Sequence, residues 1–351
     1  MDYEYDDFFV HAENHGWLKR HSAEFSDILW RTFKQKHDES SFDLCFFYLC
    51  DGFVDYGVLN RIRACGVPII NYSCNNIHQF HLVQHISRVV DCNVYAELHA
   101  GHKFAAVGVP AVQMQMGANP DIYRPVEVAY RYEASFVGQR YADRGEIMSA
   151  LISAGIDAHA FGPRWRKDAE RVGNVSFYDR MDKILSIIRM HGTGYTVRYI
   201  FSKYRKMVND KKEDKVLASQ VGGILADDAM VRVFSESKIN LGFATVYSGG
   251  REGGEELYHL RLRDFEIPMC GGFYLTHYTE ELEDYFTVGK EIECYRDTAE
   301  LLDKCHYYLK HDSKREEIRH AGLKRSLACH TWNRRFDDLF AHPTISSLLR
   351  N

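Results

Sequence analysis

The feature that most constrains the fold is a regular alternation of short apolar runs with amphipathic stretches. Residues 42–49 form an almost continuous apolar run, which is typical of a strand buried on both faces of a parallel sheet. Residues 16–37 before it and 58–65 after it have the apolar spacing of helices. Further apolar runs of strand length follow at 67–72, 89–94 and 111–116. Strand, helix and strand in this succession predict a doubly wound α/β fold with right-handed crossovers.

A turn-rich segment, Asn119–Pro125, interrupts this rhythm, and the pattern restarts with an apolar strand at 134–137. A chain of 351 residues with 45% hydrophobic residues is large enough for two cores. We therefore predict two domains, 1–125 and 126–351. The second continues with a loop at Gly138 and then with elements expected at 144–154, 157–161, 220–224, 226–236 and 238–243.

Residues 164–218 break the alternation of the second domain and read as an insertion. Between Tyr195 and Lys215 this stretch interleaves lysines and arginines with tyrosines. A solvated helical insertion explains such a run, and contact with a phosphorylated, lipid-linked or polyanionic acceptor is the alternative. We assign it no chemistry.

Composition limits the classes of partner and compartment. A net charge of −5 and an isoelectric point near 6.4 give no overall attraction to nucleic acid or anionic lipid. Nine cysteines without Cys-x-x-Cys spacing indicate reduced core thiols. The acidic first residues lack the features of a signal peptide, and no segment approaches the ~18 apolar residues needed to cross a bilayer. We predict a cytoplasmic protein, without a nucleic acid partner and with at most peripheral membrane contact.

The most informative motif for chemistry is Arg263-Asp-Phe-Glu266, which a Gly271-Gly272 pair follows and then an apolar strand at 273–276. Positions i and i+3 share one face of a helix. Arg263 can therefore offer a planar guanidinium to a diphosphate while Glu266 accepts hydrogen bonds from ribose hydroxyls. The glycines end the helix. Taken alone, the same pair can also be a surface ion pair.

Four ordered pieces around this motif resemble the C-terminal half of GT-B glycosyltransferases, most closely the branch related to the spore-maturation protein CgeB. The pieces are Phe234–Phe243, Arg263–Gly272, Gly289–Tyr295 and His330–Trp332, followed by Arg334, Arg335 and Phe336. A weaker resemblance through 117–125 and 135–140 extends it over most of the chain beyond about residue 42. The resemblance implies two Rossmann-like domains that face a cleft, an acceptor domain first and a nucleotide-sugar donor domain second. It also implies that a final helix, about 331–351, crosses back onto the first domain.

The resemblance assigns roles to individual residues of the donor domain. Gly138 lets the backbone approach the diphosphate, and Arg140, Arg144, Lys238 and Arg263 supply positive charge. Glu266 grips the ribose, and Arg140, Lys238 and Glu266 are the residues assigned to catalysis. Gly271 and Gly272 complete the donor-binding set. The base is expected along the backbone of Gly222, Gly223 and Ile224.

Two departures from the family pattern qualify this assignment. Retaining enzymes related to glycogen synthase carry a Glu, seven residues and a second Glu; Glu266 matches the second, but Tyr258 stands in the first position. Glu252, Glu255 or Glu256, in a longer glycine-rich loop, could supply the missing acid. At the other end, an acidic segment and a helix replace the expected first strand and glycine-rich loop, so the first βα unit is predicted to be absent or remodelled.

The acceptor domain contains five histidines in its central region, at 78, 81, 85, 99 and 102. Any of them could hold an acceptor hydroxyl or act as a base, but in a chain with eighteen histidines a surface or structural role is the better explanation for each one. The first three have helical spacing that could gather around zinc, yet no carboxylate or cysteine stands at matching spacing. No metal and no cofactor is expected.

The resemblance implies a metal-independent glycosyltransferase that moves a sugar from a nucleotide-sugar donor to a hydroxyl of a glycan, lipid-linked or small-molecule acceptor. Retention of configuration rests on the glycogen-synthase-like elements. A sugar-nucleotide epimerase of the same fold and a non-catalytic subunit that binds nucleotide or glycan remain as alternatives. An oligomer is compatible with the sequence.

Overall fold

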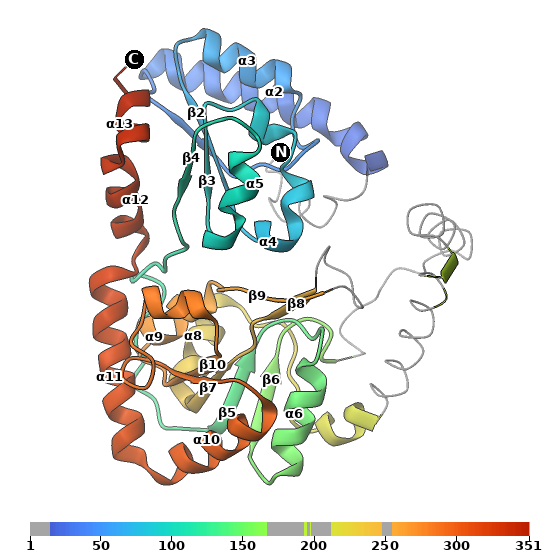
Figure 1. Cartoon of the computed structure of the whole chain (residues 1–351), viewed down its shortest axis with the longest axis vertical. Helices are drawn as coiled ribbons and strands as arrows, with labels where there is room; N and C mark the ends of the chain where they lie inside the picture. Colours follow the sequence, from blue (N-terminus) through green and yellow to red (C-terminus); the bar gives the residue numbers. More distant parts are fainter. Residues whose placement is uncertain (1–14, 167–192, 195–196, 198–211, 248–254, 351) are drawn as a thin grey trace. The chain divides into compact units, whose positions relative to one another are not determined.

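The computed structural model describes residues 15–166, 193–194, 197, 212–247 and 255–350 (Figure 1). The chain forms two compact units. Unit 1 consists of Met1–Met116 and Trp332–Asn351, and unit 2 consists of Gly117–Thr331. The sequence placed the division after residue 125, whereas the turn-rich segment Asn119–Pro125 lies wholly within unit 2.

Unit 1 contains a sheet of four parallel strands, in the order β1-β2-β3-β4. These strands are β1 (Cys45–Phe47), β2 (Ile69–Ser73), β3 (Cys92–Tyr95) and β4 (Ala111–Gln113). Each coincides with an apolar run expected to form a strand. Their spatial order follows the chain order, so the described part of this sheet contains no reversal of direction.

Helices and short 3-10 turns connect these strands. They are α2 (His15–Glu39), α3 (Tyr56–Ala64), α4 (Asn76–Gln79), η1 (Phe80–Leu82), η2 (Ile86–Arg88), η3 (Leu98–Ala100) and α5 (Gly101–Ala105). Leu18 and Phe33 of α2 share a buried apolar core with Leu59 and Ile62 of α3. Helix α2 is thus part of the core of unit 1, as expected from its apolar face.

The C-terminal residues of the chain also belong to unit 1. They form α12 (Trp332–Ala341) and α13 (Pro343–Leu348), two helices in place of the single one expected (Figure 1). The ring of Phe336 lies 5.3 Å from that of Phe46 in β1, and the ring of Trp332 lies 6.1 Å from that of Tyr72 in β2. These edge-to-face contacts place α12 against the first sheet.

Unit 2 contains five parallel strands in the order β11-β10-β7-β5-β6. They are β5 (Tyr132–Val137), β6 (Ala158–Phe161), β7 (Ser237–Gly242), β10 (Tyr274–His277) and β11 (Glu293–Tyr295). The chain moves from β5 to β6 on one side and then to β7 on the other, which is the predicted doubly wound arrangement. All five carboxyl ends meet at one edge of the sheet, called the carboxyl edge below. Ligands of open α/β sheets bind at this edge.

The remaining elements of unit 2 cover and extend this sheet (Figure 1). They are α6 (Arg144–Ser153), α8 (Asp227–Glu236), α9 (Arg263–Met269), η5 (Glu280–Asp284), α10 (Thr298–Lys310), α11 (Asp312–Cys329) and the antiparallel hairpin of β8 (Thr245–Tyr247) and β9 (Glu256–Tyr258). The strand expected at 220–224 is only a single bridge between Val221 and Ala160. Most of the 164–218 insertion lies outside the described residues. Among the helices of the described ranges, none combines the length and apolar character that a bilayer crossing needs.

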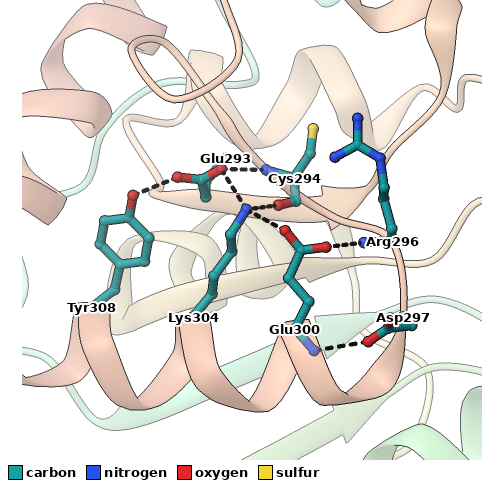
Figure 2. Close-up of polar contacts among 7 residues, drawn as sticks. All are labelled: Glu293, Cys294, Arg296, Asp297, Glu300, Lys304 and Tyr308. Carbon is teal, nitrogen blue, oxygen red and sulfur yellow. Dashed lines mark hydrogen bonds and ion pairs between the residues drawn. The ribbon is translucent and has the colours of Figure 1, made fainter.

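A polar network fastens the edge strand β11 to α10 (Figure 2). The carboxylate of Glu293 accepts hydrogen bonds from the hydroxyl of Tyr308, at 2.5 Å, and from Nζ of Lys304, at 3.1 Å. Nζ of Lys304 also donates to the carbonyl oxygen of Cys294, at 2.5 Å, and pairs with Glu300, at 2.9 Å. The side chain of Glu293 is only 9% exposed. Lys304 therefore neutralises a carboxylate that would otherwise be buried without a cation.

We expect Lys304→Met to lower the free energy of unfolding by about 2 kcal/mol, because Glu293 would stay buried without its cation. Urea unfolding monitored by circular dichroism measures the loss. Lys314→Met is the matched control, since Lys314 pairs with Glu317 at the surface, where both side chains are more than 60% exposed. Equal losses in the two variants would show that the network around Glu293 adds no stability.

Candidate functional site

Glycines at the carboxyl edge of unit 2 bring two strand ends into close contact. Gly138 follows β5, and Gly162 follows β6 with a φ of +130°. A Cβ added at Gly162 would lie 2.5 Å from the carbonyl oxygen of Gly138, so no larger residue fits without a shift of the backbone. That carbonyl also accepts a hydrogen bond from Nε1 of Trp165, at 2.7 Å. The main chain of Gly138 and the main chain of Gly162 therefore lie close together at this edge.

The predicted base-binding residues lie beside this point. The amide of Gly222 donates to the carbonyl oxygen of Ala160, at 2.7 Å, and the carbonyl oxygen of Gly223 accepts from the amide of Gly162, at 2.9 Å. Ile224 is exposed, at 71%. The structure thus brings Gly222 and Gly223 next to this edge, with part of their main-chain hydrogen-bonding capacity already used by Ala160 and Gly162.

Arg140 lies at the carboxyl edge, but two carboxylates already neutralise it. Its guanidinium pairs with Asp214 at 2.6 Å and with Glu213 at 2.8 Å, and its side chain is only 12% exposed. The carboxylate of Glu213 occupies the place where a Cβ at Gly145, in the first turn of α6, would lie. Both acids belong to the 164–218 insertion, to which the sequence analysis assigned no chemistry. These ion pairs were therefore not predicted.

Arg144, in the first turn of α6, is 3% exposed. It donates hydrogen bonds to the carbonyl oxygens of Gln139, at 2.7 Å, and Phe243, at 3.2 Å, and to the hydroxyl of Tyr141, at 2.7 Å. The Tyr141 ring covers its guanidinium at 3.8 Å, and its Nε is buried without a hydrogen-bond partner in the structure. Burial first, and the neighbouring charge of Arg261 second, lower the pKa of Arg144 to about 9.

Arg261 is a member of this edge that sequence reasoning missed. Its Nε donates to the carbonyl oxygen of Phe243, at 2.8 Å, and its Nη2 donates to those of Thr245, at 3.1 Å, and Ala244, at 3.3 Å. Burial, together with Arg261 and Arg144, lowers the pKa of His259 well below its usual value, so His259 is neutral at pH 7. None of the motif pieces quoted from the sequence includes Arg261, and only its position two residues before Arg263 could have drawn attention to it.

Arg263 and Glu266 pair with each other, as their spacing allows, but not at the surface. Nη1 of Arg263 donates to a carboxylate oxygen of Glu266. Glu266 is completely buried, and the side chain of Arg263 is 30% exposed. The other carboxylate oxygen of Glu266 and Nε of Arg263 are buried without hydrogen-bond partners in the structure. Such orphaned atoms cost free energy unless a ligand satisfies them.

Asp264, between these two residues, is 4% exposed and holds the start of α9 in place. It accepts hydrogen bonds from the hydroxyl of Tyr274, at 2.6 Å, and from the amide of Arg261. Burial raises the pKa of Asp264 from 3.8 to about 6, and these hydrogen bonds oppose the rise. The carboxylate is therefore ionised at pH 7 at a cost to stability.

A pH dependence follows from this raised pKa. Because the folded state binds the proton more tightly than the unfolded state, Asp264 lowers stability as the pH rises from about 4 to about 6, and the cost is then constant. Asparagine carries no such cost. We expect the stability of Asp264→Asn relative to the parent to improve by about 2 kcal/mol between pH 4 and pH 7. Urea unfolding at both pH values measures this difference, and a pH-independent difference would contradict the raised pKa.

Three predicted donor-binding residues lie away from the carboxyl edge. Gly271, with a φ of +66°, and Gly272 close the far end of α9 through hydrogen bonds from their amides to the carbonyl oxygens of Pro268 and Ile267, at 2.9 and 3.0 Å. Lys238 is the second residue of β7 and therefore lies at the amino end of that strand. Lys238 and Gly271 line the same cavity of about 600 Å³. The structure does not bring Lys238, Gly271 or Gly272 together with the arginines of the carboxyl edge, and their assignment to the donor site needs this correction.

Tyr258 stands where the related retaining enzymes have their first acid, and it lies within the described residues. Tyr258, at the end of β9, stacks on the ring of His277 at the end of β10, with centroids 4.5 Å apart. Glu255 and Glu256 are exposed, and Glu252 lies outside the described residues. None of the described acids of this loop takes the place of Tyr258.

The histidines of unit 1 do not gather into one site. His81, His85, His99 and His102 are exposed, and His78 is half-buried on α4. Within the described ranges, no group of three or more histidines, cysteines or acids could hold a metal ion.

A family model described as glycosyl transferase-like matches residues 144–341, which is more than half of the chain. The chain belongs to the glycosyl transferase-like family. The match begins at Arg144 and includes every element from α6 to α12, so it contains Arg261, Arg263 and Glu266. It does not separate the CgeB-related branch from the rest of the family.

Solved structures show which fold this family member has. Sucrose-phosphate synthase from Thermosynechococcus elongatus matches with a TM-score of 0.54 and 12% identity, over 89% of this chain and 77% of the other. Anabaena Alr3699/HepE in complex with UDP-glucose matches with a TM-score of 0.54 and 12% identity, over 91% and 82%. A glycosyltransferase from Rickettsia africae ESF-5 matches with a TM-score of 0.56 and 8% identity, over 100% and 84%. Together with the two parallel sheets, these matches confirm the predicted GT-B fold. No curated protein matches the chain.

Proposed function

We propose that this protein transfers a sugar from a nucleotide-sugar donor to an acceptor hydroxyl, and that unit 2 binds the donor. The observation that carries the proposal is the completely buried carboxylate of Glu266, which has one oxygen without a partner. A ribose offers two vicinal hydroxyls that would satisfy this oxygen. Anabaena HepE, which shares the fold, has been solved with UDP and with UDP-glucose.

The arginines of the carboxyl edge supply the electrostatic part of the mechanism. When the bond from the sugar to the diphosphate breaks, negative charge builds up on the departing phosphate oxygens. Arg140, Arg144 and Arg263 would stabilise that charge, and Gly138 would let the main chain approach it. Because guanidinium groups can play this part, we propose a metal-independent reaction. Retention of configuration is proposed from Glu266, which stands where glycogen-synthase-like enzymes have their second acid.

The finer assignments are proposals of the same kind. Membership of the CgeB-related branch rests on the Arg263-Asp-Phe-Glu266 motif and the pieces around it. The acceptor, a glycan, lipid-linked or small-molecule hydroxyl, is assigned to unit 1. A cytoplasmic location fits nine cysteines that form no disulfide.

Thermal unfolding with UDP, GDP, ADP and CDP tests the proposal. A nucleotide at 100 times its dissociation constant stabilises the folded state by about 2.7 kcal/mol, which raises the melting temperature by several degrees. We expect one of the four nucleoside diphosphates to raise the melting temperature, and the corresponding nucleoside to raise it less. If none of the four changes the melting temperature at millimolar concentration, the donor site does not exist.

A non-catalytic, nucleotide-binding subunit is the second candidate, because Tyr258 stands in the place of the first acid and Arg140 is already neutralised. Incubation with a nucleotide sugar, followed by product analysis, separates the possibilities. A transferase releases the nucleoside diphosphate in the presence of an acceptor extract. An epimerase converts the nucleotide sugar without an acceptor, and a binding subunit changes nothing.

A further inference from the structure

Arg261 differs from Arg140 and Arg263, at the carboxyl edge of unit 2, because hydrogen bonds to main-chain carbonyls hold its guanidinium and no ion pair among the described residues does. Arg140 is neutralised by Glu213 and Asp214, and Arg263 is paired with Glu266. Arg261 is half-buried and forms no ion pair within the described part of the chain. Its positive charge is therefore held at the edge without a carboxylate partner.

Main-chain carbonyls fix the orientation of this guanidinium. Nε and Nη2 of Arg261 donate to three successive carbonyl oxygens, those of residues 243–245, which directly follow the carboxyl end of β7. These bonds leave Nη1 without an acceptor among the residues that the structure describes. A guanidinium held in this way needs little reorganisation to bind an anion, because its planar fork is already oriented.

A second arginine, Arg144, lies close to Arg261 and is more deeply buried. Arg144 and Arg261 both donate to the carbonyl oxygen of Phe243, and their guanidinium carbons lie 3.8 and 5.6 Å from the ring centroid of Tyr141. Arg144 is 3% exposed and Arg261 is half-buried, so Arg261 is the more accessible of the two guanidinium groups. Two like charges this close repel each other, and an anion bound in front of Arg261 would relieve the repulsion.

The nearby acids, Asp264 and Asp143, do not neutralise the two guanidinium groups. Asp264 uses its oxygens to accept from the hydroxyl of Tyr274 and from the amide of Arg261. Asp143 approaches the hydroxyl of Thr245, at 3.5 Å, and its other oxygen is buried without a hydrogen-bond partner in the structure. Neither carboxylate forms an ion pair with either guanidinium in the described residues.

We propose that Arg261 is a further diphosphate-binding residue of the donor site and contacts the phosphate that carries the sugar, while Arg144 adds positive charge from a more deeply buried position. This inference rests on the proposed function, because it assigns a role within the same donor site. It adds a cation that no motif of the sequence identified, on the loop that leads into α9.

Binding of UDP and UMP to Arg261→Gln, measured by isothermal titration calorimetry, tests the inference. UMP lacks the phosphate that Arg261 would contact. We expect the affinity for UDP to fall about 20-fold and the affinity for UMP to change less than about threefold. Arg261→Lys keeps the charge and should lose less than about fivefold for UDP. Arg232→Gln is the matched control, since Arg232 is 59% exposed and pairs with Glu236 in the same unit, and it should leave both affinities unchanged.

Other results of these titrations would contradict either the role of Arg261 or the proposed function. Equal losses for UDP and UMP would show that Arg261 only holds the loop through its three carbonyl bonds, and an unchanged UDP affinity would show that it does not contact the ligand. Either result ends this inference and leaves the donor site intact. If the parent protein binds no nucleoside diphosphate at all, the proposed function fails and the role of Arg261 fails with it. Should Arg261→Gln not fold, Arg261→Lys still decides, because a loss for UMP as large as that for UDP would contradict a phosphate contact.

Discussion

Glu266→Gln should lower the kcat/KM for the nucleotide-sugar donor about 300-fold. The carboxylate is buried and has one unpartnered oxygen, so hydrogen bonds from two ribose hydroxyls would be charge-assisted and worth roughly 1.5–3 kcal/mol each. Glutamine keeps the shape but has a single acceptor oxygen and no charge. Initial rates at varied donor concentration, together with calorimetric titration of the nucleoside diphosphate, measure the loss.

A matched control separates this effect from a general loss of an ion pair. Glu317 pairs with Lys314 at the same i, i+3 spacing, but its side chain is 68% exposed. Glu317→Gln should change neither donor affinity nor stability by a measurable amount. If Glu266→Gln binds the nucleoside diphosphate as tightly as the parent, Glu266 is a structural partner of Arg263 and not a ribose-binding residue.

Arg140→Met should lower the same kcat/KM about 100-fold, and the opposite change is expected when its acidic partners are neutralised. Glu213 and Asp214 lie 2.8 and 2.6 Å from the guanidinium and compete with any phosphate for it. The double variant Glu213→Gln, Asp214→Asn should therefore bind UDP about tenfold more tightly than the parent. Initial rates at varied donor concentration measure the change in kcat/KM, and titration calorimetry of the three proteins with UDP measures the changes in affinity.

A contrary result would assign the acids a different part. If the double variant binds UDP more weakly, Glu213 and Asp214 hold Arg140 in its binding position and do not compete with the ligand. If Arg140→Met binds UDP normally, Arg140 belongs to a structural ion-pair cluster at the start of α6. Melting temperatures of all variants control for loss of the fold.

Most of the fold could be predicted because buried parallel strands leave a strong pattern in the sequence. The apolar runs at 42–49 and 67–72 became β1 and β2, and the doubly wound order of unit 2 followed from its alternation of strands and helices. The β8–β9 hairpin was missed. Its strands have three residues each and lie outside the main sheet, so they carry no sustained apolar period. The strand expected at 220–224 failed because Gly222 and Gly223 contribute no side chains to a sheet face.

Local contacts of the site could be predicted and distant ones could not, because a motif records neighbours along the chain and not partners in space. Arg263 and Glu266 were placed together correctly by helical spacing, since that contact is local. The partners of Arg140 come from more than 70 positions away, which no local pattern reveals. Lys238 could have been placed correctly, because it is the second residue of a strand, and the first residues of a strand lie at the edge of the sheet opposite the ligand.

Unit 1 is built from the N-terminal and the C-terminal segments of the sequence, and this determines which truncated forms of the protein can fold. Residues 117–331 are one uninterrupted stretch whose entry and exit meet at a bridge between Ala118 and Thr331. Expressed by itself, that stretch would keep every strand of the five-stranded sheet and is the natural fragment for isolating unit 2. A premature stop codon just after Thr331 would spare unit 2 and instead uncover Phe46 and Tyr72, which would leave the N-terminal half prone to aggregation.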